Sequence, residues 1–184
     1  MKIIYETERL IIREWEDNDY KDLFEYARDP NVSRYLSFKP YTHLQEAKDR
    51  IKKMREKYKL DTHVKPYAIM LKSENKVIGS IDVDEYYTKA DGIIEIGYIQ
   101  NANYWGNGYI TEALVGMFKY IKRNNIAKRI ECKHDTENIK SGNVMKRAGM
   151  TFEGVLRKAG KTNNTHSRGD ISLYSILDEE IILD

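Results

Sequence analysis

The stretch EIGYIQNANYWGNGYITEAL, residues 95–114, contains the end of an apolar strand, a turn with two glycines and the start of a helix. Gly106 and Gly108 let the backbone turn without Cβ clashes. Successive N–H groups of such a turn can point into one concavity, and the helix that follows adds free N–H groups and the positive end of its dipole. The segment Asn103–Gly108 therefore has the composition of a pyrophosphate-binding turn that needs no lysine.

An ordinary tight turn is the alternative interpretation, and two glycines alone favour it. The common nucleotide motifs fit less well. The chain has no GxxxxGK[ST] sequence, which argues against a P-loop NTPase, and no GxGxxG after a first strand, which argues against a dinucleotide-binding fold. The sequence around the turn therefore has to decide between a structural and a functional role.

Periodic apolar residues predict the other elements. Strands are expected at 10–12, 67–71, 77–84, 93–99, 126–133, 152–158 and 170–176, and helices at 20–27, 42–58, 109–121 and 139–148. The order is βααβββαβαββ, and a strand–helix–strand unit after an antiparallel meander requires a right-handed crossover. The sequence thus predicts an α/β fold with an α+β-like mixed sheet, which is central, twisted, largely antiparallel and flanked by helices.

Polar residues mark the starts of the first two predicted helices. Asp17 and Asn18 are suited to cap the first helix, because short polar side chains accept the free N–H groups of a first turn. Thr42 and Gln45 have the spacing of a capping box at the start of the second helix. Both helices therefore have a defined beginning in the sequence.

Length and composition indicate one globular domain spanning residues 1–184. The formal net charge is only +2, which gives no support to a nucleic-acid binder. No signal core and no apolar run of the ~18 residues that a spanning helix needs are found, so no membrane partner is expected. The single cysteine, Cys132, favours a reducing, cytoplasmic location. The four histidines lack metal-ligand spacing, so no metal site is expected.

The run at residues 95–114 resembles the acetyl-CoA-binding motif of the GNAT superfamily of N-acetyltransferases, whose core pattern is [QR]xxGx[GA]. It is most similar to the RimJ/RimL-like branch, where WGxGYxTEA is typical. Three further segments resemble that branch in the same order: TERLIIREWEDNDYKDLFEYARDPNVSRYL at 7–36, ENIKSGNVMKRAGMTFEGVLR at 137–157 and DISLYSIL at 170–177. Four ordered matches are more specific than two glycines. The first motif position, usually Gln or Arg, is Asn103 here, whose side chain is shorter.

The resemblance implies a GNAT fold with acetyl-CoA held between two splayed strands. The strand ending near Ile99 and the strand at 126–133 would diverge beyond a bulge, and the pantetheine arm would pair with their exposed backbone. An N–H near Tyr98 or Ile99 would meet the thioester oxygen, and the pyrophosphate would lie on the N–H groups of residues 105–109. The residues implied in cofactor binding are Tyr98, Ile99, Asn103, Tyr104, Trp105, Gly106, Asn107, Gly108, Tyr109, Asn138 and Ser141.

Acetyl transfer to an amine needs a base that removes a proton from the amine. Glu95 is the first candidate because it interrupts an apolar strand, and burial disfavours the charged form of a carboxylate, which helps it accept a proton. It can act through a water. An ion pair with a nearby lysine or arginine, or a solvent-facing position, explains such a carboxylate equally well. Glu131 and Asp82 are the other strand carboxylates to test.

The departing thiolate benefits from a proton donor. Asn138 and Ser141 resemble the family's NxxS pattern, which implies that Asn138 bonds the pantetheine arm and that Ser141 is a catalytic acid near the sulfur. Helix capping is the alternative role for both. Many GNAT enzymes carry a tyrosine acid four residues later, but that residue is Met145 here, so the acid is Ser141 or a water. The stretch 158–161 also lacks the carboxylate that some RimL-type proteins carry there.

The resulting hypothesis is an enzyme that moves the acetyl group of acetyl-CoA to a primary amine, with a protein N-terminal α-amine as one acceptor class. Members of this branch also modify polyamines, amino acids or drugs, so a small-molecule acceptor is an alternative, as is a non-catalytic acyl-CoA sensor. Homodimers are common in this fold family. The acceptor pocket is expected between the first two helices, the end of the meander and residues 162–168. Five aromatic residues are candidates for its lining, although core packing explains most of them equally well: Tyr35, Phe38, Tyr41, Tyr86 and Tyr87.

Overall fold

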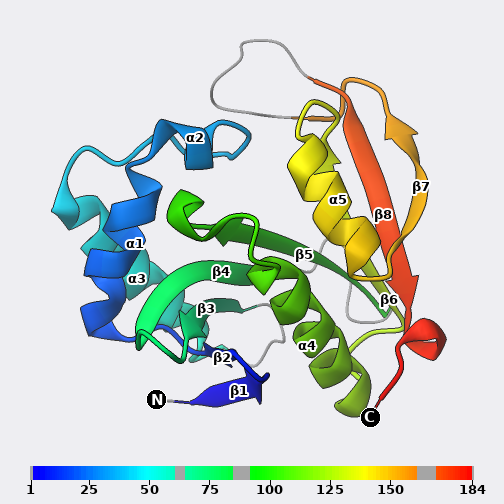
Figure 1. Cartoon of the computed structure of the whole chain (residues 1–184), viewed down its shortest axis with the longest axis horizontal. Coiled ribbons are helices and arrows are strands. Elements are labelled where there is room, and N and C mark those ends of the chain that lie inside the picture. Colours follow the sequence, from blue (N-terminus) through cyan, green and yellow to red (C-terminus); the bar gives the residue numbers. More distant parts are fainter. Residues whose placement is uncertain (1, 61–64, 85–91, 161–168, 184) are drawn as a thin grey trace.

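The fold is a mixed eight-stranded sheet with helices on both faces (Figure 1). This computed structural model describes residues 2–60, 65–84, 92–160 and 169–183. The strands are β1 Ile3–Glu6, β2 Leu10–Arg13, β3 Pro66–Leu71, β4 Lys76–Asp84, β5 Ile93–Gln100, β6 Arg129–Asp135, β7 Thr151–Leu156 and β8 Ile171–Leu177. The helices are α1 Tyr20–Ala27, α2 Pro30–Ser33, α3 Leu44–Lys57, α4 Tyr109–Arg123 and α5 Ile139–Arg147. Across the sheet the order is β1-β2-β3-β4-β5-β6-β8-β7, and β5 and β6 run parallel while the other neighbours run antiparallel.

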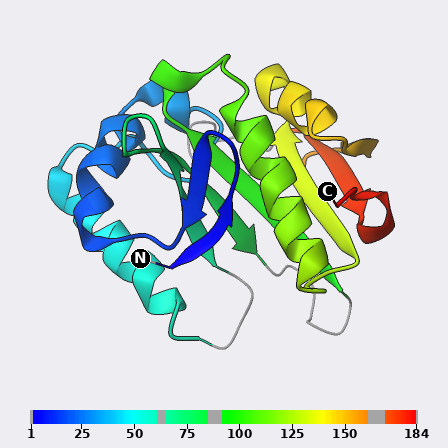
Figure 2. The same ribbon diagram turned by 60° about the horizontal axis from the view of Figure 1, so that its bottom comes forward.

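Two helical layers enclose the sheet. On one face α1 and α3 form a core in which Tyr26 is 1% exposed. On the other face α4 and α5 form the larger core, with Met117 fully buried. Figure 2 shows the hairpin of β1 and β2 beside α4. Gly116 permits this close approach, because a Cβ at that residue would lie 2.9 Å from Cδ1 of Tyr5.

The predicted element order is confirmed, with two additions. The structure adds β1 and the short helix α2. β1 is an edge strand with both ends exposed, so its sequence lacks the alternation that marks a half-buried strand. β6 begins at Arg129 rather than at Ile126, because the N–H of Ile126 donates to the Ile121 carbonyl at 3.0 Å and belongs to the turn that ends α4.

The prediction that Thr42 and Gln45 form the capping box of the second predicted helix, α3, is wrong. The cap residue of α3 is His43, and the carboxylate that completes the cap belongs to Glu46. Its Oε1 accepts the backbone N–H groups of Thr42 and His43, both at 2.8 Å. These hydrogen bonds hold the pKa of Glu46 below its ordinary value. Gln45 instead bonds within the first turns of the helix, since its side chain reaches Asp49.

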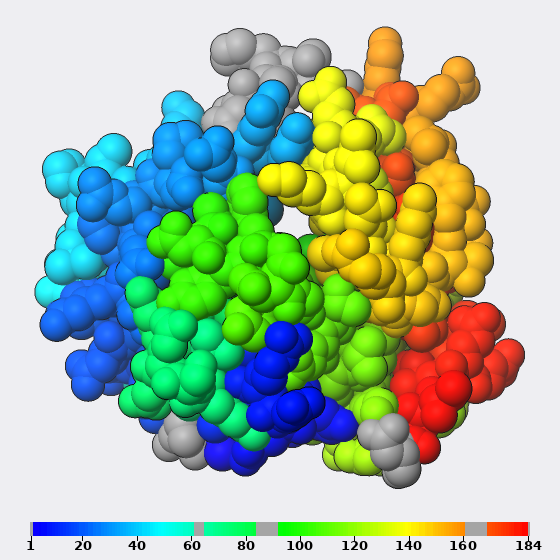
Figure 3. All heavy atoms as spheres, in the orientation of Figure 1, coloured from blue at the N-terminus to red at the C-terminus, as the bar shows by residue number. Residues whose placement is uncertain are grey.

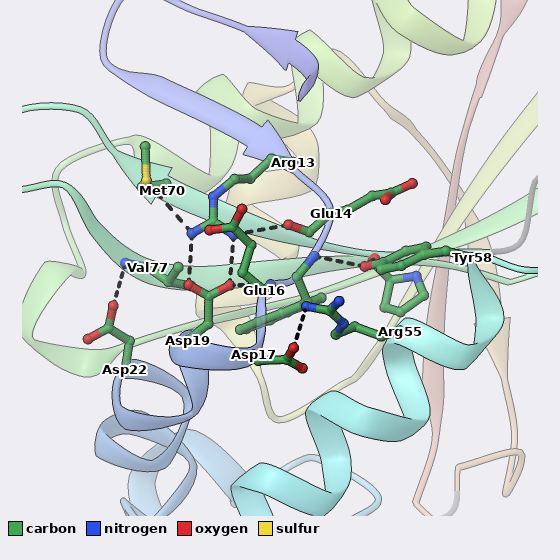
Figure 4. A network of polar contacts seen from close by, with 12 residues as sticks. Arg13, Glu14, Glu16, Asp17, Asp19, Asp22, Arg55, Tyr58, Met70 and Val77 are labelled. Atoms are coloured by element: carbon green, nitrogen blue, oxygen red, sulfur yellow. Dashed lines mark hydrogen bonds and ion pairs between the residues drawn. The ribbon is translucent and has the colours of Figure 1, made fainter. Parts of the chain in front are cut away.

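A buried ion pair fixes the start of α1 (Figure 4). Asp17 and Asn18, the predicted caps, lie in a 3-10 turn that ends at Asp19. Arg13, the last residue of β2, donates from Nη1 and Nη2 to the two carboxylate oxygens of Asp19 at 2.7 and 2.8 Å. Asp19 also accepts the backbone N–H of Glu16 at 2.7 Å. The bidentate pair therefore ties the first helical layer to the sheet.

Asp19→Ala should lower the free energy of unfolding by about 3–5 kcal/mol, because it leaves the buried Arg13 guanidinium without its counter-charge. Asp17→Ala is the matched control. The Asp17 carboxylate is 78% exposed and pairs with Arg55 at 3.2 Å, and an exposed pair contributes at most about 1 kcal/mol. Urea unfolding followed by circular dichroism measures both variants. Equal losses would contradict the structural role of the Arg13–Asp19 pair.

Some predictions concern residues outside the described ranges. Residues 85–91 and 161–168 are not described, so the expected contributions of Tyr86, Tyr87 and residues 162–168 to the acceptor pocket lie outside the structure. Among the helices that are described, none combines the length and the apolar character needed to cross a membrane.

Candidate active site

β5 and β6 pair over only three residues and then separate. Ile93–Glu95 lies in register with Arg129–Glu131. Beyond these residues β5 stays paired with β4 as far as Gln100, and β6 stays paired with β8 as far as Asp135. Both registers are unbroken, so the strands separate without the predicted bulge. Their inner edges therefore border a gap, and Figure 3 shows an opening there between the green segment after β5 and the yellow α5.

The backbone of β5 directs the N–H of Tyr98 into this gap. The N–H of Asn101 donates to a β4 carbonyl at 2.8 Å, and the N–H of Ile96 bonds toward the Cys132 sulfur of β6. Because N–H groups alternate in direction along a strand, the N–H of Tyr98 points the same way as that of Ile96. The N–H of Ile99 points toward β4 instead. Of the two predicted donors to the thioester oxygen, the geometry favours Tyr98.

The first half of the turn after β5 is held together by its own N–H groups. The Asn101 side chain accepts the N–H of Asn103 at 3.0 Å. The N–H groups of Tyr104 and Trp105 donate to carbonyls at the start of the turn, at 3.0 and 3.2 Å. The Trp105 N–H was among the predicted phosphate donors, but it is used inside the turn. These three residues therefore shape the turn with their backbones.

The second half of the turn differs from the first in how its N–H groups are used. The N–H groups of Gly106–Tyr109 donate to no acceptor in the described part of the chain. Gly106 and Gly108 have φ angles of +85° and +77°, which favour glycine, and α4 begins directly after them. From the facing helix α5, the Lys140 ammonium lies 4.5 Å from the centroid of a Trp105 ring. In the described chain, the N–H groups without an acceptor in the predicted phosphate-binding turn thus begin at Gly106, and the turn faces α5.

Arg9, just before β2, supports this turn, although sequence reasoning did not single it out. Its Nη1 donates to the Asn107 carbonyl at 3.1 Å, and its Nε donates to Glu112 at 2.6 Å. Because C=O and N–H of a trans peptide point in opposite directions, the N–H of Gly108 points away from Arg9. Burial opposes ionisation of the Glu112 carboxyl, but hydrogen bonds from Thr7 and Arg9 hold its pKa below the ordinary value. The motif segments at 7–36 and 95–114 were the only sequence signal for this contact.

α5 borders the gap opposite the turn. Asn138 is its cap residue, and its Oδ1 lies 3.4 Å from the N–H of Ser141 that it accepts, so the predicted capping role is present. The Ser141 hydroxyl lies 2.7 Å from the Tyr98 hydroxyl. Met145 is 1% exposed and lies in the core, and its thioether has no proton to donate. The structure thus brings Ser141 to the gap and leaves Met145 out of it.

Glu95 projects from the face of β5 that is opposite to the Tyr98 side chain and α5. Its Oε2 lies 2.6 Å from Nζ of Lys133, and its side chain is 20% exposed, so the ion-pair alternative is realised. A Cβ on Gly97, two residues further on the same face, would meet no atom within 4 Å. Glu131 is more enclosed, at 8% exposed, and accepts from Arg129 Nε at 2.9 Å. Glu95 is therefore the carboxylate beside the open part of β5.

Asp82 projects from the same face of the sheet as Glu95, opposite Gly97 in the register, but it lies against α1 and α3. It lines a cavity of about 20 Å³, room for one water, together with Tyr26, Tyr41, Phe38 and Ile99. Phe38 and Tyr41, two of the predicted acceptor aromatics, have ring centroids 5.4 Å apart. Asp82 is thus less suited than Glu95 to reach a substrate in the gap. The residues that the structure describes contain no group of three or more His, Cys, Asp or Glu able to hold a metal.

Related proteins identify the family of this chain. Residues 9–151 match the family described as an acetyltransferase (GNAT) domain, so the chain belongs to the GNAT acetyltransferases. It is 32% identical over 174 residues to the uncharacterized N-acetyltransferase YnaD of Bacillus subtilis (strain 168), covering 95% of this chain and 96% of that one. The predicted family and enzyme class are confirmed.

Solved structures agree with the predicted fold. The acetyltransferase (GNAT family) from Bacillus anthracis has a TM-score of 0.82 at 28% identity, over 95% of this chain and 98% of that chain. RimL, a ribosomal L7/L12 alpha-N-protein acetyltransferase solved in complex with coenzyme A, has a TM-score of 0.81 at 19% identity, over 96% and 98%. The GNAT fold is therefore confirmed, and RimL is among the proteins that share it.

Gly106→Val should weaken acetyl-CoA binding roughly tenfold to a hundredfold. The valine adopts a strained positive φ and places a branched side chain over the N–H groups of the turn. Gly149→Val is the matched control, because Gly149 has a φ of +89° but lies after α5. Isothermal titration calorimetry should show weaker binding for the first variant alone. Equal affinities in both variants and in the wild type would rule out the turn as the phosphate site.

Proposed function

We propose that this GNAT enzyme transfers the acetyl group of acetyl-CoA to a primary amine by direct attack, and that the amine is a protein N-terminal α-amine. The observation that carries the proposal is the gap between β5 and β6, which ends at the four unengaged N–H groups of Gly106–Tyr109 in the described chain. An elongated molecule with an anionic group at one end and a thioester at the other fits such a gap. GNAT enzymes use acetyl-CoA, which has this form.

Three groups around β5 would act on the thioester. The N–H of Tyr98 points into the gap and would donate to the carbonyl oxygen as negative charge develops on it. Glu95 lies on the face toward α1 and α3, from which the amine would arrive. Ser141 lies on the α5 side, where the sulfur would depart, with Asn138 beside the pantetheine arm. The amine and the leaving thiolate would therefore occupy opposite sides of the carbonyl carbon.

The base would be Glu95, acting directly or through a water. Its pairing with Lys133 at 2.6 Å holds the carboxylate in one place beside Gly97. The proton removed from the amine passes to this carboxylate as the C–N bond forms. Glu131 is the second candidate, but its bond with Arg129 and its burial make it harder for a substrate to reach.

The open surface beside Glu95 favours the end of a polypeptide as the acceptor. Gly97 is exposed and has free space where a side chain would begin, so an extended chain can lie along β5 there. RimL, which shares this fold, is named as an alpha-N-protein acetyltransferase, which supports the same acceptor class. Polyamines, amino acids and aminoglycosides are the competing acceptors.

The test is an assay of free CoA thiol release with a panel of amines. N-terminal peptides should release CoA faster than polyamines, amino acids or aminoglycosides at equal concentration. Mass spectrometry of the products should place the acetyl group on the α-amine. Preference for a small amine would move the acceptor to that class. Acetyl-CoA binding without turnover on any amine would contradict the proposal and indicate a sensor.

Glu95→Gln should lower kcat by about 10²-fold or more, because the amide cannot accept the amine proton, while the Kd for acetyl-CoA stays the same. The substitution also breaks the ion pair with Lys133, so Lys133→Met is the control that loses the pair and keeps the carboxylate. Steady-state kinetics with the best acceptor should show a much smaller loss for Lys133→Met. Normal turnover in Glu95→Gln would transfer the base role to Glu131.

A further inference from the structure

Tyr98 contributes its side chain to the gap as well as its backbone. The phenol Oη lies 2.7 Å from Oγ of Ser141 and 2.9 Å from the backbone carbonyl oxygen of the same residue. The ring packs against the core shared with α4 and α5. A side chain from β5 and the first turn of α5 therefore meet at one point across the opening.

The two distances allow only two arrangements of the protons. A carbonyl oxygen can only accept, whereas each hydroxyl carries one proton and can also accept. In the first arrangement Tyr98 donates to the Ser141 carbonyl and Ser141 donates to Tyr98. In the second arrangement Tyr98 donates to Ser141 Oγ, and the Ser141 hydroxyl donates its own hydrogen bond to a third atom. A negatively charged atom in the gap selects the second arrangement, because a charge-assisted hydrogen bond is stronger than a neutral one.

The backbone around Ser141 is fixed from both diverging strands. Tyr98 of β5 holds it on one side, and His134 of β6 abuts the next residue, Gly142, on the other. A Cβ on Gly142 would lie 2.7 Å from His134 Nε2, so only glycine lets α5 approach this closely. The His134 ring is itself held, with Nδ1 2.7 Å from the Asp135 carbonyl. The backbone that carries the Ser141 side chain is therefore held in place.

We propose that Tyr98 is a positioning residue that turns the Ser141 hydroxyl toward the leaving sulfur, so that the two hydroxyls together stabilise the CoA thiolate. This inference rests on the proposed function, which places the thioester sulfur beside Ser141. Tyr98 would then act on both heteroatoms bonded to the carbonyl carbon: its N–H would face the carbonyl oxygen, and its hydroxyl would act on the sulfur through Ser141.

The proton balance of the reaction closes without ionising either hydroxyl. The amine nitrogen forms a bond to the carbonyl carbon, the C–S bond breaks, and its electron pair leaves on sulfur. The proton lost by the amine passes to Glu95 and, through solvent, finally to the CoA thiolate. Burial raises the pKa of Tyr98, so its phenol stays protonated and donates at neutral pH. Tyr98 and Ser141 therefore begin and end the cycle as neutral donors.

The test is an ultraviolet titration of the thiolate of CoA bound to the whole protein, which needs no acceptor. In the wild type the pKa of the bound thiol should lie about one pH unit below that of free CoA, a tenfold change in the thiolate ratio. Burial raises the pKa of Cys132, so the single protein thiol does not titrate in this range. Among the described residues, Arg147, Tyr174 and His134 are further titratable groups near the pair, and they are unchanged in the variants below.

Tyr98→Phe should raise the pKa of the bound CoA thiol most of the way to that of free CoA. It should also lower kcat roughly tenfold, with the KM for acetyl-CoA unchanged. Ser141→Ala should raise the pKa of the bound thiol fully to that of free CoA. Adding Tyr98→Phe to Ser141→Ala should have no further effect, because Tyr98 acts through Ser141. Tyr67→Phe is the matched control. Its ring is also enclosed, with a pKa raised by burial, but it lies in β3 away from the gap. It should leave the titration and the kinetics unchanged.

A bound thiol that titrates equally in the wild type and in Tyr98→Phe would overturn this inference, as would additive losses in the double variant. If Tyr98→Phe does not fold, Ser141→Ala alone tests the inference. A bound thiol in Ser141→Ala with the same pKa as in the wild type would also overturn it. CoA release with amines by the wild type, together with either result, would leave the proposed function standing. A wild-type protein that does not bind CoA would overturn both.

Discussion

The hydrogen-bonded contact between β5 and β6 stops after three residue pairs, and the whole candidate site depends on this early stop. Each strand keeps its antiparallel neighbour on the other side, so the sheet stays continuous while its middle opens. The unpaired edges would be costly if they were buried without partners. A ligand that pairs with them removes that cost, which is a physical reason for an extended pantetheine arm to bind there.

Strand geometry then distributes the chemistry around β5. Side chains alternate between the two faces of a sheet, while N–H groups alternate between its two edges. Glu95 therefore faces the side of the sheet that carries α1 and α3, the Tyr98 side chain faces α5, and the Tyr98 N–H lies in the plane of the gap. One strand with an unbroken register thus supplies groups in three directions. A bulge in β5 would have reversed some of these directions.

The sequence predicted local features well because they depend on neighbouring residues. The glycine turn, the strand carrying Glu95 and the helix after Gly108 all follow from short-range spacing. Contacts between distant residues had no such signal: Arg9 with Asn107, and Tyr98 with Ser141, are separated by 98 and 43 positions. The cap at Glu46 was missed for a different reason, since two neighbouring polar residues offered nearly equivalent spacings and only the backbone selects between them.

The hydrogen bond from Arg9 to the Asn107 carbonyl limits when the turn can form during folding. The turn obtains part of its shape from a hairpin that lies 98 positions earlier in the chain. A contact of this separation closes a long loop, and such contacts form slowly. The hairpin of β1 and β2 is synthesised before α4 but can complete the turn only after α4 has docked beside it. The turn therefore reaches its final shape only after the chain through α4 has folded against the hairpin.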